Sequence, residues 1–78
     1  MKVSVKYFGI LAETAGKKEE ILEVAQGMSA AELKVRQIKT YKIPEAESVQ
    51  LAVNQNLNTE VELKEGDEVA FLPPFAGG

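Results

Sequence analysis

The chain has 78 residues, of which 45% are hydrophobic and 27% charged, and its formal net charge is −3. A chain of this length forms one domain with a single small core. Its composition is typical of a globular protein, not of a disordered or fibrous one. The sequence contains no cysteine and no histidine. This excludes disulfides, thiol nucleophiles, the usual zinc and iron ligands and the imidazole base of many enzymes. We therefore expect a protein that is not an enzyme on its own.

Neither a membrane nor a nucleic acid is an expected partner. No apolar run approaches the length of a membrane span, and no basic and then apolar signal segment begins the chain. The nine basic residues do not gather into a patch with interleaved aromatic residues, which disfavours nucleic-acid binding. The expected location is the cytoplasm.

The clearest strand pattern opens the chain. Residues 2–8 alternate polar and apolar side chains, which predicts a strand with Val3, Val5 and Tyr7 on one face. Gly9 ends it.

Two helices and a second strand follow. Residues 10–15 have the pattern of a short helix, and residues 19–24 that of a strand. Ser29 and Glu32 form a capping box, which predicts that a longer helix runs from residue 30 to about Tyr41. Two apolar residues of this helix are expected to complete the core: Leu33 and Ile38.

The second half of the chain predicts more strands. Residues 49–53 alternate again and predict a strand, and residues 54–56 predict a turn. Residues 58–63 predict an irregular or short extended piece, and residues 64–67 a second turn. The apolar run 68–72 predicts the last strand.

The chain ends in an uncharged tail. Pro73 and Pro74 stop the last strand, because proline has no amide hydrogen for a sheet and favours an extended chain before it. Gly77 and Gly78 have no Cβ, so they fit a channel too narrow for other residues. The only charge from Val69 onward is the terminal carboxylate. This layout indicates a tail that inserts into another protein.

The last residues, Glu65-Gly66-Asp67-Glu68-Val69-Ala70-Phe71-Leu72-Pro73-Pro74-Phe75-Ala76-Gly77-Gly78, resemble the ending of the MoaD/ThiS family of sulfur-carrier proteins. The double proline is most similar to the molybdopterin synthase small subunits, called MoaD. The resemblance extends over nearly the whole chain, including Phe8, Glu13 and the run Leu51-Ala52-Val53-Asn54.

The resemblance implies an α+β fold of the β-grasp, ubiquitin-like kind. Such a fold has a mixed sheet of four to five strands with one main helix packed on one face, and its first and last strands lie side by side in the middle. Residues 1–72 would form this domain, and residues 73–78 would form the extended Gly-Gly tail.

The resemblance also implies a function in molybdenum cofactor biosynthesis. An E1-like adenylating enzyme would use ATP to activate Gly78, and an indirect sulfur donor would convert it to a thiocarboxylate. The tail would enter the large subunit of molybdopterin synthase, where the sulfur passes to cyclic pyranopterin monophosphate. The inserted residues would be Pro73, Pro74, Phe75, Ala76 and Gly77. The family works as a heterotetramer. Neither a metal nor a permanently bound cofactor is implied.

Three apolar residues are candidates for the partner interface: Phe71, Leu72 and Phe75. Phe71 and Leu72 point to opposite faces of the last strand, so we expect one in the core and the other at the interface. Phe75 departs from the small aliphatic residue that is usual in the family. It either folds back on the domain's own surface or occupies a pocket of the partner, and the second is favoured because an exposed aromatic beside a docking tail is a plausible hot spot.

Acidic residues crowd the segment before the last strand: Glu60, Glu62, Glu65, Asp67 and Glu68. They are either the solvated edge of a hairpin or an acidic collar that steers the tail toward a basic partner groove.

Three other functions are alternatives to the role in molybdopterin synthase. A thiamine-type sulfur carrier shares the Gly-Gly ending but generally lacks the double proline. A ubiquitin-like protein modifier would be conjugated to lysines through Gly78. A plain interaction domain would tolerate deletion of Gly78.

Overall fold

The computed structural model describes residues 1–57 and 60–73. Its elements, in chain order, are β1 (Lys2–Tyr7), α1 (Ile10–Ala15), β2 (Glu19–Glu23), α2 (Ala30–Tyr41), the 3-10 helix η1 (Ala46–Ser48), β3 (Gln50–Val53), β4 (Asn56–Leu57) and β5 (Glu68–Leu72). Within the described residues, no helix is both long and apolar enough to cross a bilayer.

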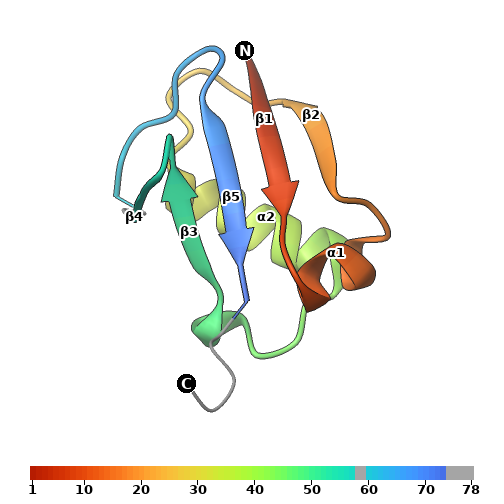
Figure 1. Cartoon of the computed structure of the whole chain (residues 1–78). Coiled ribbons are helices and arrows are strands. Elements are labelled where there is room, and N and C mark those ends of the chain that lie inside the picture. Colours follow the sequence, from red (N-terminus) through yellow and green to blue (C-terminus); the bar gives the residue numbers. More distant parts are fainter. Residues whose placement is uncertain (58–59, 74–78) are drawn as a thin grey trace.

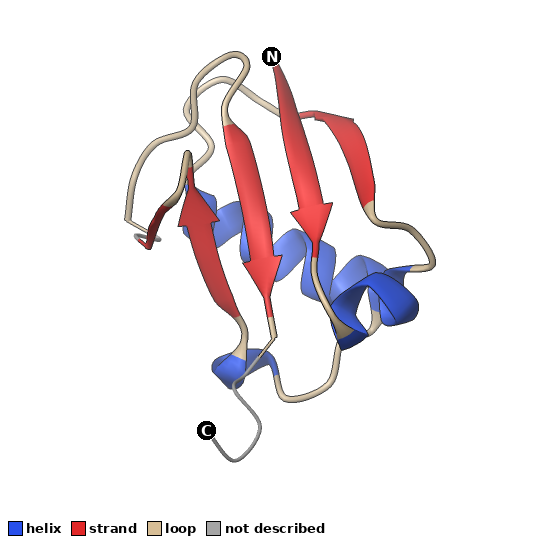
Figure 2. Ribbon diagram, viewed as in Figure 1, coloured by secondary structure: helices blue, strands red, loops and turns tan. Residues whose placement is uncertain are grey.

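The strands form one mixed sheet in the order β2-β1-β5-β3-β4. The helix α2 crosses behind the sheet, and the small helix α1 lies at one end of it (Figure 1). Figure 2 shows the same two layers, with the strands in front and α2 behind them. This is the β-grasp arrangement that the resemblance implies, with five strands in the described part of the chain.

The first and last strands are neighbours at the centre of the sheet, as expected. β1 and β5 run parallel, with Val5 opposite Val69 and Tyr7 opposite Phe71. These four side chains are at most 3% exposed because they lie on the face that α2 covers. Val3 is buried with them, so the alternation read from the sequence gives the buried face correctly.

The capping box predicted for α2 is present. The Glu32 N–H donates to Ser29 Oγ at 3.1 Å, and the Ser29 N–H donates to Glu32 Oε1 at 2.9 Å. Leu33 is fully buried as predicted, whereas Ile38 is only half-buried. The polar side chain of Gln37 fills a core position instead, with 2% of its surface exposed.

Gln37 is buried because it belongs to a polar cluster, the Glu20 cluster, between α2 and the sheet. Gln37 Nε2 donates to the Tyr7 hydroxyl at 2.8 Å, and Glu20 Oε2 accepts from the hydroxyls of Tyr7 at 2.6 Å and Tyr41 at 2.7 Å. Lys17 pairs with Glu20 Oε1 at 3.4 Å. No buried side-chain nitrogen or oxygen in the described residues lacks a partner, so this cluster satisfies its own polar atoms.

The cluster shifts the ionisation of its members. Burial first, and then the hydrogen bond to Glu20, raise the pKa of Tyr7. Burial by itself would raise the pKa of Glu20, but the hydrogen bonds from Tyr7, Tyr41 and Lys17 together lower it. The Glu20 carboxylate is therefore held in its charged form, and the Tyr7 hydroxyl in its neutral form.

The segment before β5 is partly extended, as predicted. The Ala30 N–H donates to the Val61 carbonyl at 2.9 Å, and the Leu63 N–H donates to the Met28 carbonyl at 2.8 Å. These two bonds tie the segment to the start of α2 and bury Leu63.

Candidate functional site

The candidate site is the tail root, which we define as residues 71–73, where β5 leaves the sheet. β5 lies between β1 and β3, so its end is held from both sides. Leu72 is paired with Gln50 of β3, and the Phe8 N–H donates to the Phe71 carbonyl at 3.2 Å. The tail therefore starts from a central strand, which is a well-fixed base.

Pro73 packs against Gly9 at the end of β1. Gly9 has φ +56°, and a Cβ built on it would lie 3.1 Å from Pro73 Cγ. That separation is tighter than ordinary van der Waals contact, and a positive φ disfavours residues with a side chain. Gly9 therefore leaves room for the proline ring. The sequence predicts only that Gly9 ends a strand, because no local pattern indicates its contact with Pro73, a residue distant in sequence.

Phe71 and Leu72 do point to opposite faces of β5, and the structure settles which one is internal. Phe71 is fully buried, and its ring centroid lies 5.4 Å from that of Tyr7. Its side chain is thus unavailable to a partner, and its place among the candidate interface residues is wrong. Leu72 is half-buried on the other face, so it remains a candidate for that interface.

The sequence does not predict an interface role for two exposed apolar residues beside the tail root. Phe8 is 46% exposed and Ile10 is 58% exposed, and they flank Gly9, against which Pro73 packs. The alternation of β1 gives one indication that Phe8 is exposed, because it places Phe8 on the face opposite the buried Tyr7. Together with Leu72, these side chains form an apolar surface around the point where the tail leaves.

The acidic segment lies at the far end of β5 from the tail. The turn before β5 is at the top of Figure 1, and the strand runs from it to the tail root at the bottom. A strand of five residues is roughly 17 Å long. Of the two alternatives, the acidic collar is therefore the wrong one, because the acidic residues and the tail lie at opposite ends of β5.

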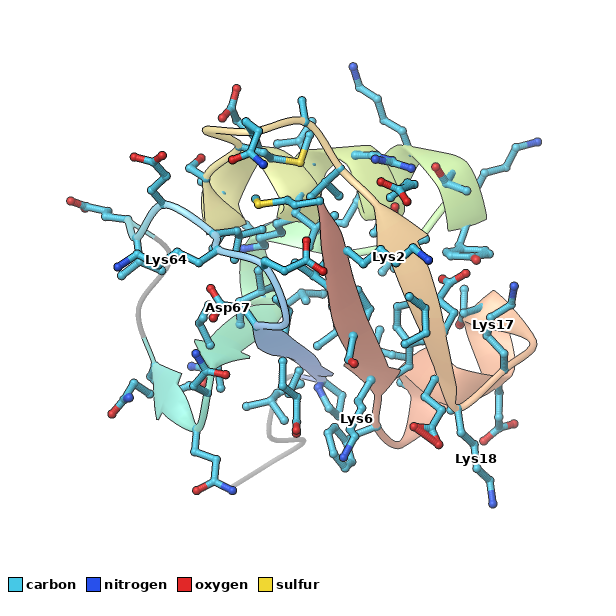
Figure 3. All side chains as sticks on the ribbon, turned by 90° about the horizontal axis from the view of Figure 1, so that it is seen from above. Lys2, Lys6, Lys17, Lys18, Lys64 and Asp67 are labelled. Atoms are coloured by element: carbon cyan, nitrogen blue, oxygen red, sulfur yellow. The ribbon has the colours of Figure 1, made fainter. Side chains whose placement is uncertain are left out.

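Three of the five acidic side chains, those of Glu65, Asp67 and Glu68, have structural partners. Asp67 accepts from the Lys64 N–H at 2.8 Å, and Glu65 accepts from the Lys2 N–H at 2.9 Å. Glu68 pairs with Lys6 at 3.3 Å. Figure 3 shows Lys64 and Asp67 close together in this turn. These contacts agree with the interpretation of the acidic segment as the solvated edge of a hairpin.

The remaining predicted tail residues lie outside the described residues: Pro74, Phe75, Ala76, Gly77 and Gly78. Across residues 1–57 and 60–73, no group of three or more acidic residues is placed to hold a metal ion. The described site therefore consists of the end of a central strand, which fixes the start of the tail, and an apolar surface around it. The contact between Pro73 and Gly9 sets the direction in which the chain leaves the sheet.

Comparison with known proteins gives relatives over the full length. The model of the ThiS family matches residues 5–78. The molybdopterin synthase sulfur carrier subunit of Mycobacterium tuberculosis is 40% identical, covering 100% of this chain and 99% of its own length. The subunit of the same name from Chlamydomonas reinhardtii is 34% identical, covering 100% of both chains.

Solved structures agree with these relatives. A putative molybdopterin converting factor subunit 1 from Pyrococcus furiosus has a TM-score of 0.82 at 31% identity, covering 96% of this chain and 99% of its own. A chain from the complex of subunits 1 and 2 of the molybdopterin-converting factor of Helicobacter pylori has a TM-score of 0.69 at 28% identity, covering 100% of both chains. The fold, the tail root at the end of a central strand and these full-length matches lead to one conclusion: the chain belongs to the ThiS/MoaD family.

Proposed function

We propose that this chain is the sulfur-carrier subunit of a molybdopterin synthase. The observation that carries the proposal is the match over the whole chain, at 34% and 40% identity, to proteins named for that role. The geometry supports it, because the central strand β5 leads directly into the segment that ends in Gly78. In this proposal residues 1–72 are the folded domain and residues 73–78 are the tail.

The reacting group is the terminal carboxylate, since the sequence has no cysteine to carry sulfur. An E1-like enzyme transfers AMP from ATP to the Gly78 carboxylate and releases pyrophosphate. The terminal sulfur of a persulfide donor then displaces AMP and forms an acyl disulfide, which a second thiol of the donor cleaves to leave a thiocarboxylate on Gly78 and a disulfide on the donor. The thiocarboxylate donates its sulfur to cyclic pyranopterin monophosphate, and water restores the Gly78 carboxylate. The catalytic residues and the ATP site belong to the partners, and this chain keeps no cofactor of its own.

The principal partner is the large subunit, into which the tail inserts. Extended residues span at most about 3.5 Å each, so residues 73–78 carry the carboxylate up to roughly 20 Å from the sheet. Phe8, Ile10 and Leu72 surround the root and contact the large subunit where the tail enters it. The Helicobacter pylori complex of subunits 1 and 2 supports a partnership of this kind, and the working assembly is a heterotetramer.

The proposal is tested by the intact mass of the chain after incubation with ATP, its activating enzyme and a sulfur donor. We expect a gain equal to the replacement of one oxygen by sulfur. A chain that lacks Gly78 is the control and should show no gain. An unchanged mass, under conditions in which a known carrier reacts, would favour a protein modifier or a plain interaction domain.

Phe75 is proposed to occupy an apolar pocket of the large subunit. Truncation of a buried aromatic at an interface is among the costliest changes, so Phe75→Ala should weaken binding of the large subunit roughly tenfold. Isothermal titration calorimetry measures this affinity. Val35→Ala is the matched control, because Val35 is exposed on α2, away from the tail root. Equal affinities for the two variants would refute this role of Phe75.

A further inference from the structure

The strand β2 is an open edge of the sheet, and the proposed function gives it no role. It lies at one end of the strand order, next to β1, and Figure 1 shows it as the outermost strand on the right of the sheet. The strand at the other end of the order, β4, has two residues, whereas β2 has five. Within the described residues, β2 is therefore the longer edge at which a further strand can pair.

The backbone of β2 has hydrogen-bonding groups on its outer side. The Tyr7 N–H donates to the Lys18 carbonyl at 2.8 Å, so residue 18 faces β1. Because this direction alternates along an antiparallel strand, residues 20 and 22 also face β1, and the N–H and C=O groups of residues 19, 21 and 23 point outward. Arg36 donates to the Glu23 carbonyl at 3.2 Å. The other outward groups have no partner in the described part of the chain, so an added strand can bond to them.

The side chains of β2 that face away from α2 have an acidic, apolar, acidic pattern. Glu20 belongs to the cluster between α2 and the sheet, so its neighbours Glu19 and Ile21 lie on the opposite face, together with Glu23. Ile21 is 65% exposed. The Glu19 side chain has no hydrogen bond or ion pair in residues 1–57 and 60–73. Glu23 pairs with the N-terminal ammonium at 3.4 Å but stays 70% exposed, so both carboxylates are accessible to a further cation.

Charge alternates from strand to strand across this face of the sheet. In β1, Lys6 lies opposite Glu19, and Lys2 lies opposite Glu23. Lys6 also pairs with Glu68 of β5 at 3.3 Å. Opposite charges on neighbouring strands stabilise a sheet, and like charges destabilise it. The position beyond each of the two β2 glutamates therefore favours a basic residue, and the position between them favours an apolar one.

A second copy of the chain does not meet this requirement. Two β2 strands that pair with Ile21 opposite Ile21 place glutamate opposite glutamate, whether they run parallel or antiparallel. Like charges of this kind are a common protection against edge-to-edge association of sheets. The edge is therefore suited to a different partner.

We propose that the β2 edge binds an extended segment of a partner protein with the order basic, any, apolar, any, basic. The segment adds a strand to the sheet, with its basic residues opposite Glu19 and Glu23 and its apolar residue beside Ile21. Since β1 separates β2 from β5, the tail root stays uncovered while the edge is occupied. Binding here does not involve the terminal carboxylate, so it is independent of the proposed sulfur chemistry.

The first test is a titration of the isotope-labelled full-length chain with the peptide acetyl-Gly-Lys-Thr-Ile-Thr-Lys-Gly-amide, followed by nuclear magnetic resonance. We expect saturable shift changes centred on the amides of residues 19, 21 and 23, and slower hydrogen exchange of the Ile21 amide. The same peptide with glutamate in place of both lysines should leave these amides unchanged. Changes centred on another surface, or none at millimolar peptide, would overturn the proposal. Shifts of these amides that depend on the concentration of the chain alone would assign the edge to a second copy and would also overturn it.

The second test separates strand pairing from general attraction between a basic peptide and an acidic chain. Glu19→Lys places like charges opposite each other, so it should weaken binding of the lysine peptide about fivefold. It should also bind the glutamate peptide more tightly than the wild-type chain does. Glu47→Lys is the matched control, because it changes the net charge equally at an exposed residue of η1. That helix leads into β3, which β1 and β5 separate from β2.

Circular dichroism checks that both variants are folded, as expected for two exposed positions. Equal losses of affinity in the two variants would overturn the proposal, because they would mean that net charge alone attracts the peptide. Neither test uses the activating enzyme or the sulfur donor, so their outcomes are separate from that of the mass measurement.

Discussion

At the scale of single residues, the tail root depends on the absence of a side chain at Gly9. Gly9→Ala places a residue with a side chain at φ +56°, with its Cβ 3.1 Å from Pro73 Cγ. Backbone strain of this kind costs about 1–3 kcal/mol, and the proline ring has to move. We expect a loss of stability of that order in urea unfolding. We also expect slower formation of the thiocarboxylate, because the tail leaves in a different direction.

Gly16→Ala separates these two effects. Gly16 also has a positive φ, +78°, but nothing lies within 4 Å of a Cβ built there. That variant should lose about 1 kcal/mol of stability from strain and keep the normal rate of thiocarboxylate formation while folded. If both variants slowed the reaction equally, the contact between Gly9 and Pro73 would have no role in directing the tail.

At the scale of elements, what the sequence predicts well depends on neighbours along the chain. The alternation in β1 and the capping box of α2 are local patterns, and both are present. The sequence does not predict the strand β4, and it predicts a turn at the first residue of that strand, Asn56. Its two residues form a strand only because β3 lies beside them. The burial of Gln37 is not predictable locally for the same reason, since the partners that allow it come from other elements.

The start of α2 offers a direct test of a local pattern. Ser29→Ala removes the hydroxyl that accepts from the Glu32 N–H, and loss of such a cap costs about 1 kcal/mol. For a domain of this size we expect the melting temperature to fall by roughly 4–8 °C, measured by circular dichroism. Ser48→Ala is the control, because the Ser48 side chain makes no hydrogen bond in the described part of the chain. An equal fall in both variants would mean that the capping box contributes nothing measurable.

At the scale of the whole molecule, the two ends of β5 have different roles. Its start is fixed by the turn in which Asp67 bonds to Lys64 and Asn54, and its end leads to the tail. Sequence order alone places the acidic residues near the tail, because it does not say at which end of a strand they lie. The tail root itself is also a product of the tertiary fold, since Gly9 and Pro73 meet only when β1 and β5 pair.

The Glu20 cluster holds the helix layer to the sheet layer and makes the stability of the whole domain depend on pH. The hydrogen bonds from Tyr7, Tyr41 and Lys17 outweigh burial and lower the pKa of Glu20 below its ordinary value of 4.5. A carboxylate with a lowered pKa in the folded state stabilises that state above its unfolded pKa. This contribution is lost as the pH falls through the folded pKa. Glu20→Gln keeps an acceptor oxygen but removes the charge, so it should cost about 1–2 kcal/mol at pH 7.

Urea unfolding from pH 7 to pH 3 measures this contribution as the difference in stability between the wild-type chain and Glu20→Gln. We expect that difference to be largest at neutral pH and to shrink below about pH 4.5, as Glu20 itself becomes uncharged. Glu47→Gln is the control, because Glu47 is exposed and has no hydrogen bond or ion pair in residues 1–57 and 60–73. A difference that stayed constant across this range would mean that the charge of Glu20 does not join the two layers. In that case the shape of the side chain, and not its ionisation, would be what the cluster requires.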